Sequence, residues 1–271
     1  MPISDITLAG GMRQNLASLQ LVAALQARTT ERLSTGKRVN SAVDDPSAYF
    51  AAQNHLSRAS DLAARKDAMG EAIQSVRAAI QGIEGITNLI EQAKGLTASA
   101  RGATATDRAT LAAQFDDLRT QIDQLAGDSG YRGTNFLDSG TLTVDFNEDG
   151  TSNLTITGFD ATCGGDLGIA AAANDWVADS DIDAAVANLD AALGTLRANA
   201  KTLSTNLSVV TTRQSFTSGL ITTLATGADQ LTAADQNEEA ANMLALQTRQ
   251  QLGIVALSLS AQAQQNILRL F

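Results

Sequence analysis

The chain has 271 residues, a formal net charge of −10 and an isoelectric point of about 4.5, and only 4% of its residues are aromatic. An acidic surface repels nucleic acid and anionic lipid, so we expect neither a nucleic acid nor a membrane as a partner. Few rings and many small or amide side chains favour thin seams between helices over a thick core. Copies of so acidic a chain repel one another, and any self-association should therefore depend on salt.

Cysteine usage and the first residues bear on the cellular compartment. Cys163 is the only cysteine, which excludes an intramolecular disulfide. The opening stretch MPISDITLAGG carries an early acid, Asp5, and no cleavable apolar core, so the sequence predicts that no signal peptide is cleaved. On that rule alone the protein would be cytoplasmic.

Helical periodicity starts weakly near the N-terminus. Its apolar positions are Leu16, Leu19, Ala23 and Leu33. The pattern predicts a helix that ends near residues 34–36, where Ser, Thr and Gly follow one another. After a polar connection, Asp45 as N-cap and Pro46 in the first turn predict the start of the next helix.

Two stronger stripes follow at alternating steps of four and three residues, which is the spacing of one helix face. The second stripe consists of Met69, Ile73, Val76, Ile80, Ile83, Thr87 and Ile90. Gly102 marks a turn after this helix, and Thr106 is the predicted N-cap of the next one. The third stripe consists of Leu111, Phe115, Leu118, Ile122 and Leu125.

Residues 141–159 have a different pattern, because β-branched and polar residues alternate on either side of residues 147–150. Alternation around an Asn-Glu-Asp-Gly turn predicts a β-hairpin. Residues 161–175 then have the small and glycine-rich composition of a loop.

The longest stripe runs from residue 182 to residue 231, and only Gln214 and Thr217 interrupt its apolar series. Its positions are Ile182, Val186, Leu189, Leu193, Leu196, Ala200, Leu203, Leu207, Val210, Gln214, Thr217, Ile221, Leu224, Ala228 and Leu231. A series of this length predicts a coiled-coil-like rod. Together the stripes predict a mainly α fold: a long antiparallel helical bundle or coiled-coil rod with a small β-hairpin insert.

The last twenty residues, LGIVALSLSAQAQQNILRLF, carry a single charge, Arg269. Their helical stripe consists of Leu252, Val255, Leu259, Ala263, Ile267 and Leu270. Interspersed Ser, Gln and Asn residues keep the apolar run shorter than the about 20 residues that a membrane span requires. A helix of this kind needs a partner. Because both chain ends point to the same end of the predicted rod, we expect the N-terminal helix to cover part of the stripe.

The sequence offers no cluster of residues that predicts catalysis or cofactor binding. His55 has no second ligand at metal-binding spacing, and Cys163 has no activating histidine beside it. The adjacent acids Asp44 and Asp45, like Glu238 and Glu239, would point in different directions on a helix. We therefore expect no enzymatic activity, no cofactor and no metal.

Three segments carry a resemblance to a known family. ERLSTGKRVNSAVDDPS, residues 31–47, resembles the N-terminal signature of bacterial flagellins, which is close to ERLSSGLRINSAKDDPA. Residues 107–137 are similar to the second conserved block of that family, and residues 231–271 to its C-terminal block. The chain departs from the pattern by lacking the usual C-terminal proline, by having Cys163, and by reducing the outer domain to residues 141–180. Within the family it resembles the alphaproteobacterial type with a minimal outer domain.

The resemblance implies an organisation and a role. Residues 1–40 with 236–271 would form the inner filament core, residues 41–140 with 181–235 a helical rod, and residues 141–180 a small outer insert. The terminal helices would be disordered in the monomer and would become ordered when subunits assemble. The implied function is that of a structural subunit of the bacterial flagellar filament for swimming motility.

The implied partners are other copies of the chain, the flagellar export apparatus, an export chaperone, and the hook-associated junction and cap proteins. The implied location is the extracellular filament, reached without cleavage of a signal peptide. The alternatives are a hook–filament junction protein and, if the resemblance is set aside, a cytosolic coiled-coil adaptor. The residues expected at the filament-assembly interface are Leu16, Leu19, Arg32, Leu33, Arg38, Asn40, Asp44, Asp45, Leu252, Val255, Leu259, Ile267 and Leu270.

Two surface regions carry further expectations. In the helix that the vertebrate Toll-like flagellin receptor detects in other family members, Glu91 here replaces an arginine and Gly95 a leucine, on either side of Lys94. The resemblance therefore implies weak or absent receptor activation, and strong activation of reporter cells by the purified monomer would refute it. The hairpin hydroxyls that are candidates for O-linked sugars are Thr151, Ser152 and Thr155.

Overall fold

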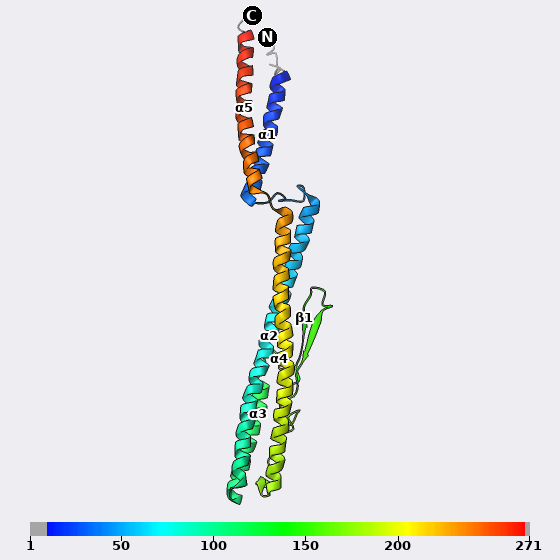
Figure 1. The fold of residues 1–271 in the computed structure, drawn as a ribbon, viewed down its shortest axis with the longest axis vertical. Helices are drawn as coiled ribbons and strands as arrows, with labels where there is room; N and C mark the ends of the chain where they lie inside the picture. The colour runs from blue at the N-terminus through cyan, green and yellow to red at the C-terminus, as the bar shows by residue number, and fades with distance from the viewer. Residues whose placement is uncertain (1–9, 269–271) are drawn as a thin grey trace, which may run out of the picture. The chain divides into compact units, whose positions relative to one another are not determined.

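The computed structural model describes residues 10–268, which form a mainly α-helical protein with one small antiparallel sheet, as the sequence predicts (Figure 1). The elements in chain order are helices α1 (Gly10–Thr35), α2 (Pro46–Arg101) and α3 (Ala105–Asp128), strands β1 (Thr141–Asp145) and β2 (Asn153–Thr157), the short 3-10 helix η1 (Ala173–Trp176), and helices α4 (Asp179–Thr232) and α5 (Gln236–Leu268). The described residues fall into two compact units. One takes its residues from both ends of the chain, up to Ser57 and from Thr223 onwards, and the other is Arg58–Thr222.

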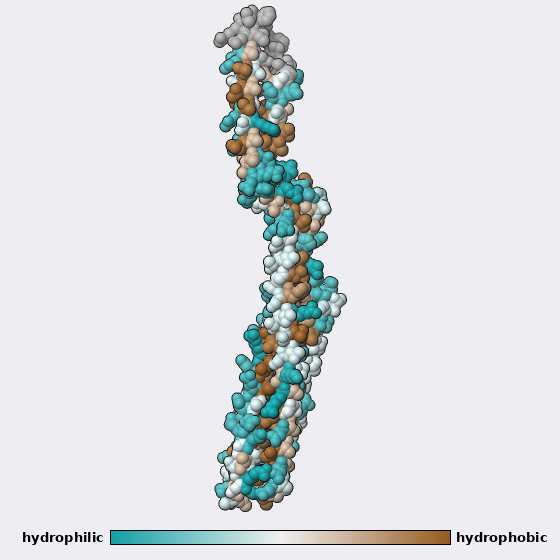
Figure 2. All heavy atoms as spheres, viewed as in Figure 1, coloured by the Kyte–Doolittle hydropathy of each residue, from teal (hydrophilic) through white to brown (hydrophobic). Residues whose placement is uncertain are grey.

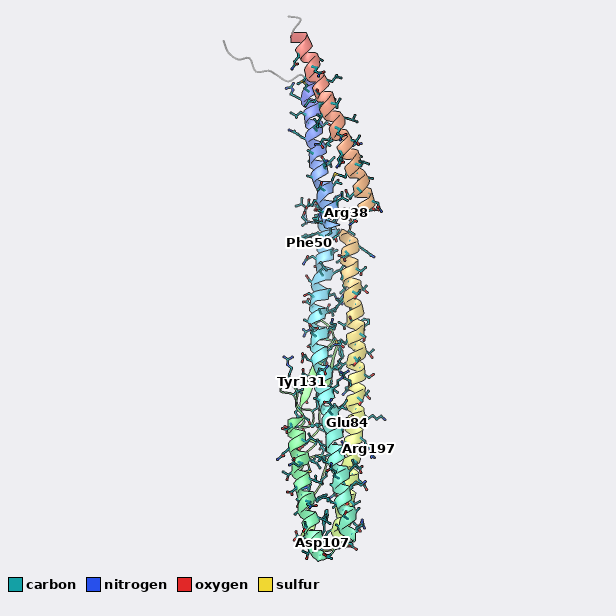
Figure 3. All side chains as sticks on the ribbon, turned by 90° about the vertical axis from the view of Figure 1, so that its left-hand side faces the viewer. Arg38, Phe50, Glu84, Asp107, Tyr131 and Arg197 are labelled. Carbon is teal, nitrogen blue, oxygen red and sulfur yellow. The ribbon has the colours of Figure 1, made fainter. Side chains whose placement is uncertain are left out.

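The larger unit, Arg58–Thr222, is held together by the predicted stripes of α2, α3 and α4. Every position named in these three stripes is buried or half-buried, which confirms the predicted helix faces. Figures 1 and 3 show α3 and α4 alongside α2 in this unit. The two polar positions of the α4 stripe fit the seam, because Gln214 Nε2 donates to the carbonyl of Lys66 at 3.3 Å and Thr217 is buried.

The start of α3 differs from the prediction by two residues. Thr104, not Thr106, is the N-cap: its Oγ1 accepts from the backbone N–H of Asp107 at 3.4 Å and donates to Asp107 Oδ2 at 2.7 Å. The Thr104 hydroxyl thus satisfies one of the free N–H groups of the first turn, whereas Thr106 lies inside that turn. The turn at Gly102 between α2 and α3 is confirmed.

Strands β1 and β2 form the predicted hairpin, with Leu142 opposite Ile156 and Thr143 opposite Thr155. Successive side chains alternate between the two faces, so Ile156 is buried while both threonines are exposed. The turn between the strands contains Gly150 at a φ of +67°, a left-handed conformation that glycine adopts without strain.

The loop after the hairpin is irregular, as predicted, but packed. Two side chains of α3 bind its backbone: Arg119 Nε donates to the carbonyl of Ile169 at 2.9 Å, and Asp116 Oδ1 accepts from the N–H of Ala172 at 3.1 Å. The loop leads to Trp176, which is fully buried with its ring centroid 5.1 Å from that of Phe115. The core of the larger unit therefore continues beneath this loop.

The smaller unit pairs the two ends of the chain, with α1 and α5 side by side (Figure 1). Its two helix breaks, residues 36–45 and residues 233–235, are joined by backbone hydrogen bonds. Arg38 N–H donates to the carbonyl of Thr232 at 2.7 Å, and Ala234 N–H donates to the carbonyl of Gly36 at 2.9 Å. Each break thus satisfies backbone groups that the other leaves open at its helix ends.

Gly82 and Gly194 provide a matched test of packing in the larger unit. Both lie inside helices, but a Cβ on Gly82 would be 2.6 Å from Leu137 Cδ1 and 2.8 Å from Ser129 Cβ, whereas a Cβ on Gly194 would meet nothing within 4 Å. We expect Gly194→Ala to raise the free energy of unfolding by about 0.5–1 kcal/mol, because alanine is the better helix former. We expect Gly82→Ala to lower it by about 1–3 kcal/mol, because overpacking displaces the neighbours.

Urea unfolding followed by circular dichroism measures both glycine variants. If both variants were stabilised equally, Ser129 and Leu137 would not lie against Gly82 of α2 as described.

Candidate assembly surface

The seam between α1 and α5 holds the two chain ends together. Val22 of α1 and Leu246 of α5 are buried in it. Gly253 lets the helices approach closely, because a Cβ at that position would lie 2.6 Å from Leu19 Cδ2. The buried and half-buried positions of α5 on this side follow steps of four and three: Glu239, Met243, Leu246, Gln250, Gly253 and Leu257.

An ion pair stabilises the seam where α5 begins. Arg32 Nη1 donates to Glu239 Oε1 at 2.7 Å, and the two side chains are only 19% and 10% exposed. Charge-assisted hydrogen bonds of this kind are shorter and stronger than neutral ones, and burial protects them from salt. Arg32 belongs to the signature that the sequence singles out. In the sequence, its partner Glu239 is only one of two adjacent acids with no predicted role. Only the structure identifies Glu239 as the partner of Arg32.

The face of α5 opposite the seam is apolar and uncovered. Leu244, Leu252, Val255 and Leu259 are 67%, 64%, 64% and 67% exposed. Since successive helix residues are rotated by about 100°, these positions lie on the side of α5 away from Leu246 and Gly253. Figure 2 shows apolar side chains at the surface of this helix pair. The side chain of Ile267 and the whole of Leu270, which belong to the same predicted stripe, lie outside the described residues.

For Leu252, Val255 and Leu259, the expectation that α1 covers the C-terminal stripe is therefore wrong, whereas Ile267 and Leu270 stay untested. The physical reason is that α5 carries two apolar stripes on opposite sides, and α1 packs on the one that contains Gly253, where the backbones come closest. The sequence contains a pattern that indicates this second stripe, because its positions from residue 239 to residue 257 are separated by alternating steps of four and three.

The predicted interface residues of α1 divide between the seam and the surface. Leu19 and Leu33 are half-buried, whereas Leu16 is exposed. Leu21 and Leu25, which lie outside the predicted stripe, are exposed as well. The α1 helix therefore also presents apolar side chains that its own chain leaves uncovered.

The signature segment turns the chain from α1 into α2, and Figure 3 shows Arg38 at this bend. Gly36, at a φ of +68°, ends α1 in the left-handed conformation that closes many helices. Asp45 Oδ1 accepts from the N–H of Ala48 at 3.1 Å and so caps α2, as the sequence predicts. Arg38 lies 3.9 Å from Asp45 in an exposed ion pair, which contributes little to stability.

Asp44 and Asn40 stabilise the bend itself. Asp44 Oδ2 accepts from the hydroxyl and the N–H of Ser41, both at 3.0 Å, and from the N–H of Asn40 at 3.2 Å. These hydrogen bonds, led by that of the Ser41 hydroxyl, lower the pKa of Asp44. Asn40 Nδ2 donates to the carbonyl of Lys37 at 3.2 Å. The signature residues thus bind one another within the chain, and their contact with a second copy stays a prediction.

The predicted receptor region lies on α2 of the larger unit. Glu91 and Gly95 are exposed, and Lys94 Nζ forms an ion pair with Asp190 of α4 at 2.9 Å. The hydrogen bond to Asp190 raises the pKa of Lys94. The one cation of this region is therefore already partnered within the chain, and weak receptor activation stays a prediction.

The predicted glycosylation acceptors lie in the hairpin. Thr151 and Thr155 are exposed, and Ser152 is half-buried. Thr151 Oγ1 accepts from Asn147 Nδ2 at 2.7 Å, and Thr155 Oγ1 lies 3.2 Å from Thr143 Oγ1 across the strands. Their modification stays a prediction.

Cys163 is buried in the loop after the hairpin, and His55 is half-buried on α2. The N–H of Cys163 donates to Asp123 Oδ1 at 2.6 Å, and burial, followed by the charge of Asp123, raises the pKa of the thiol to about 12. Among residues 10–268, no three or more His, Cys, Asp or Glu side chains are grouped to hold a metal ion. Within the same residues, no helix has the length and apolar character that a membrane crossing requires.

We expect Cys163 to react with a thiol reagent at pH 8 on the order of 100-fold more slowly in the folded chain than in denaturant, because the reaction requires the loop to open. The raised pKa means that the folded state holds this proton more tightly than the unfolded state, where the thiol pKa is about 8.5. The resulting stability is fully present below about pH 8.5 and is lost as the pH rises towards 12.

Alkaline unfolding of the intact chain beside Cys163→Ala measures the pH dependence, and the variant should lack this part of it. Equal labelling rates in the folded and denatured chain would contradict the buried placement.

The chain matches the family model described as the bacterial flagellin N-terminal helical region over residues 3–141, about half of its length. It is also 30% identical to Flagellin FljM of Caulobacter vibrioides over 275 aligned residues, which cover 100% of both proteins. The chain therefore belongs to the bacterial flagellin family.

Other relatives match over shorter segments. Flagellin C of Rhizobium meliloti is 46% identical over 59 residues, 22% of this chain and 18% of the relative. A flagellin of Brucella melitensis is 45% identical over 60 residues, 22% of this chain and 21% of the relative, so the chain spans about a fifth of each of these two proteins. A crystal structure of Bacillus cereus flagellin aligns with 54% of this chain and 86% of that chain, at a TM-score of 0.46 and 18% identity, a likeness too small to support an argument.

Proposed function

We propose that this chain is a structural subunit of the helical flagellar filament and that its paired terminal helices form the surface through which copies assemble. Membership of the flagellin family supports the role. The observation that carries the proposal is that α5 is apolar on two opposite sides while α1 covers only one of them. An exposed apolar stripe of this kind marks an interaction surface, and neighbouring copies would cover it.

The uncovered side chains are large enough for assembly to depend on them. Full burial of a leucine or valine side chain contributes about 1.5–3 kcal/mol. Leu244, Leu252, Val255 and Leu259 retain 64–67% exposure, so most of that contribution remains for a contact between copies. A contact between unlike surfaces that does not close on itself produces an open helical polymer instead of a dimer.

We further propose that residues 1–40 with 236–271 lie in the inner part of the filament, residues 41–140 with 181–235 form the rod, and residues 141–180 face outwards. The exposed apolar residues of α1 and α5 support an inner position for the chain ends, and the exposed threonines of the hairpin support an outer one. The terminal helices become ordered as copies cover them, because the lost chain entropy is offset only when both faces of α5 are buried.

The same role implies export by the flagellar apparatus with a chaperone and without a cleaved signal peptide, a place in the extracellular filament, and junction and cap proteins as further partners. Within the family the competing role is that of a hook–filament junction protein. Two features favour the filament subunit: the small insert, and α5, which runs without a break from Gln236 to Leu268.

Electron microscopy of filament seeds mixed with the purified chain tests the function. A filament subunit lengthens the seeds in proportion to the protein added. Growth that stops after one layer would show the junction role instead, and an absence of any addition would contradict both.

Glutamine substitutions on the outer face of α5 test the surface. We expect the triple variant Leu252→Gln/Val255→Gln/Leu259→Gln to raise the critical concentration for elongation by more than about tenfold, because at least about 1.4 kcal/mol of apolar burial per subunit is lost. Its melting temperature should be unchanged, since these side chains are largely exposed in the single chain. Gln247→Ala, an exposed position of α5 outside the stripe, is the matched control and should elongate normally.

Removal of residues 252–271 should leave a soluble chain that does not lengthen seeds. Elongation by this truncated chain as readily as by the intact one would show that the terminal helix is not the assembly surface.

A further inference from the structure

One side of the paired helices α1 and α5 is hollowed into an open groove of about 330 Å³. Its floor consists of the buried Thr29, Glu239 and Leu246, and exposed arginines stand on both sides, Arg28 on α1 and Arg249 on α5. The full lining is Leu25, Arg28, Thr29, Arg32, Glu239, Asn242, Ala245, Leu246 and Arg249.

The groove is basic although the protein is acidic. Three guanidinium groups and one carboxylate give its lining a net charge of +2, in a chain whose formal net charge is −10. The Arg32 guanidinium is bound to Glu239. Within the part of the chain that the structure describes, neither Arg28 nor Arg249 has a carboxylate at ion-pair distance. Arg28 only adds a weak electrostatic influence on Asp44, behind the hydrogen bonds that Asp44 accepts.

We propose that this groove receives a carboxylate side chain of a second copy of the chain, bound between Arg28 and Arg249, with its carbon stem against Leu25 and Ala245. Guanidinium groups on two sides match the donor requirement of a carboxylate. The inference rests on the filament role proposed above, and it adds a polar, register-setting contact to the apolar one.

A second copy is the occupant that the charges favour. Its surface is rich in carboxylates, because the chain has 29 Asp and Glu residues against 19 Lys and Arg residues. The groove is also continuous with apolar surface that the proposed assembly covers, since Leu25 in its lining is exposed. Complementary charge at such a contact offsets the repulsion between acidic copies and selects one alignment among those that apolar contact alone would allow.

The test compares two double variants that change the net charge equally, from −10 to −12, because each removes two positive charges. The double variant Arg28→Gln/Arg249→Gln removes the two guanidinium groups of the groove that have no ion-pair partner among the described residues. Arg77→Gln/Lys201→Gln removes two exposed cations from the larger unit and serves as the control. Both variants carry the same increase in long-range repulsion, so a difference between them reports on the groove.

We expect the groove variant to have a critical concentration for elongation about tenfold above that of the control variant at about 50 mM NaCl, and less than about threefold above it at about 500 mM NaCl, because salt screens the lost attraction. Circular dichroism confirms that both variants are folded. Arg28→Lys/Arg249→Lys should recover part of the difference, since lysine keeps the charge without the forked geometry. An electron microscopy map of unmodified filaments should show a neighbouring carboxylate at Arg28 or Arg249.

Equal critical concentrations for the groove and control variants would overturn the inference, as would a loss that salt does not diminish, because that would indicate packing. A filament map with the groove open to solvent or filled only by apolar side chains would overturn it as well. In each case growth of the unmodified chain would leave the filament role standing. Failure of the unmodified chain to grow would overturn the filament role and the inference with it.

Discussion

The structure depends on one constraint: α5 is apolar on two opposite sides, and its own chain supplies a single helix to cover it. The choice of covered side follows from backbone approach, because Gly253 admits Leu19 where a larger residue would hold the helices apart. The other side, with Leu252 and Leu259, is left in water. In the filament role proposed for this flagellin chain, neighbouring copies would cover that side, which would couple the ordering of the chain ends to the association of copies.

Polar groups then decide how the paired ends are aligned. The Arg32–Glu239 pair and the hydrogen bonds between the two helix breaks set the register of α1 against α5. Apolar contacts are tolerant of sliding, whereas a partly buried ion pair is strong only at one alignment, and an unpaired Glu239 would be costly. The arginine groove extends the same principle from the chain to its proposed neighbours, since Arg28 and Arg249 in its lining have no ion-pair partner among residues 10–268.

The larger unit is stabilised in a different way, because the predicted apolar stripes of its helices are buried within the chain, although Phe216 and Val177 stay exposed. The stripes of α2, α3 and α4 are buried or half-buried along their length, and the loop after the hairpin packs on α3. Arg119 and Asp116 bind the loop backbone where no strand or helix could satisfy it. The core of this unit is therefore formed within the chain, in contrast to the outer side of α5.

The sequence by itself determined the features that depend on local chemistry and on a single period: the three stripes of α2, α3 and α4, the hairpin around residues 147–150, and the bend that Gly36 and Asp45 delimit. It also identified Leu252, Val255 and Leu259 as part of an apolar stripe that needs a partner. Only the tertiary structure decided which of the two stripes of α5 meets α1, that Glu239 is the partner of Arg32, and that Arg28 and Arg249 share a groove. Periodicity reveals that a helix face is apolar, but two apolar faces on one helix are equivalent until the distance between backbones and the pairing of distant charges distinguish them.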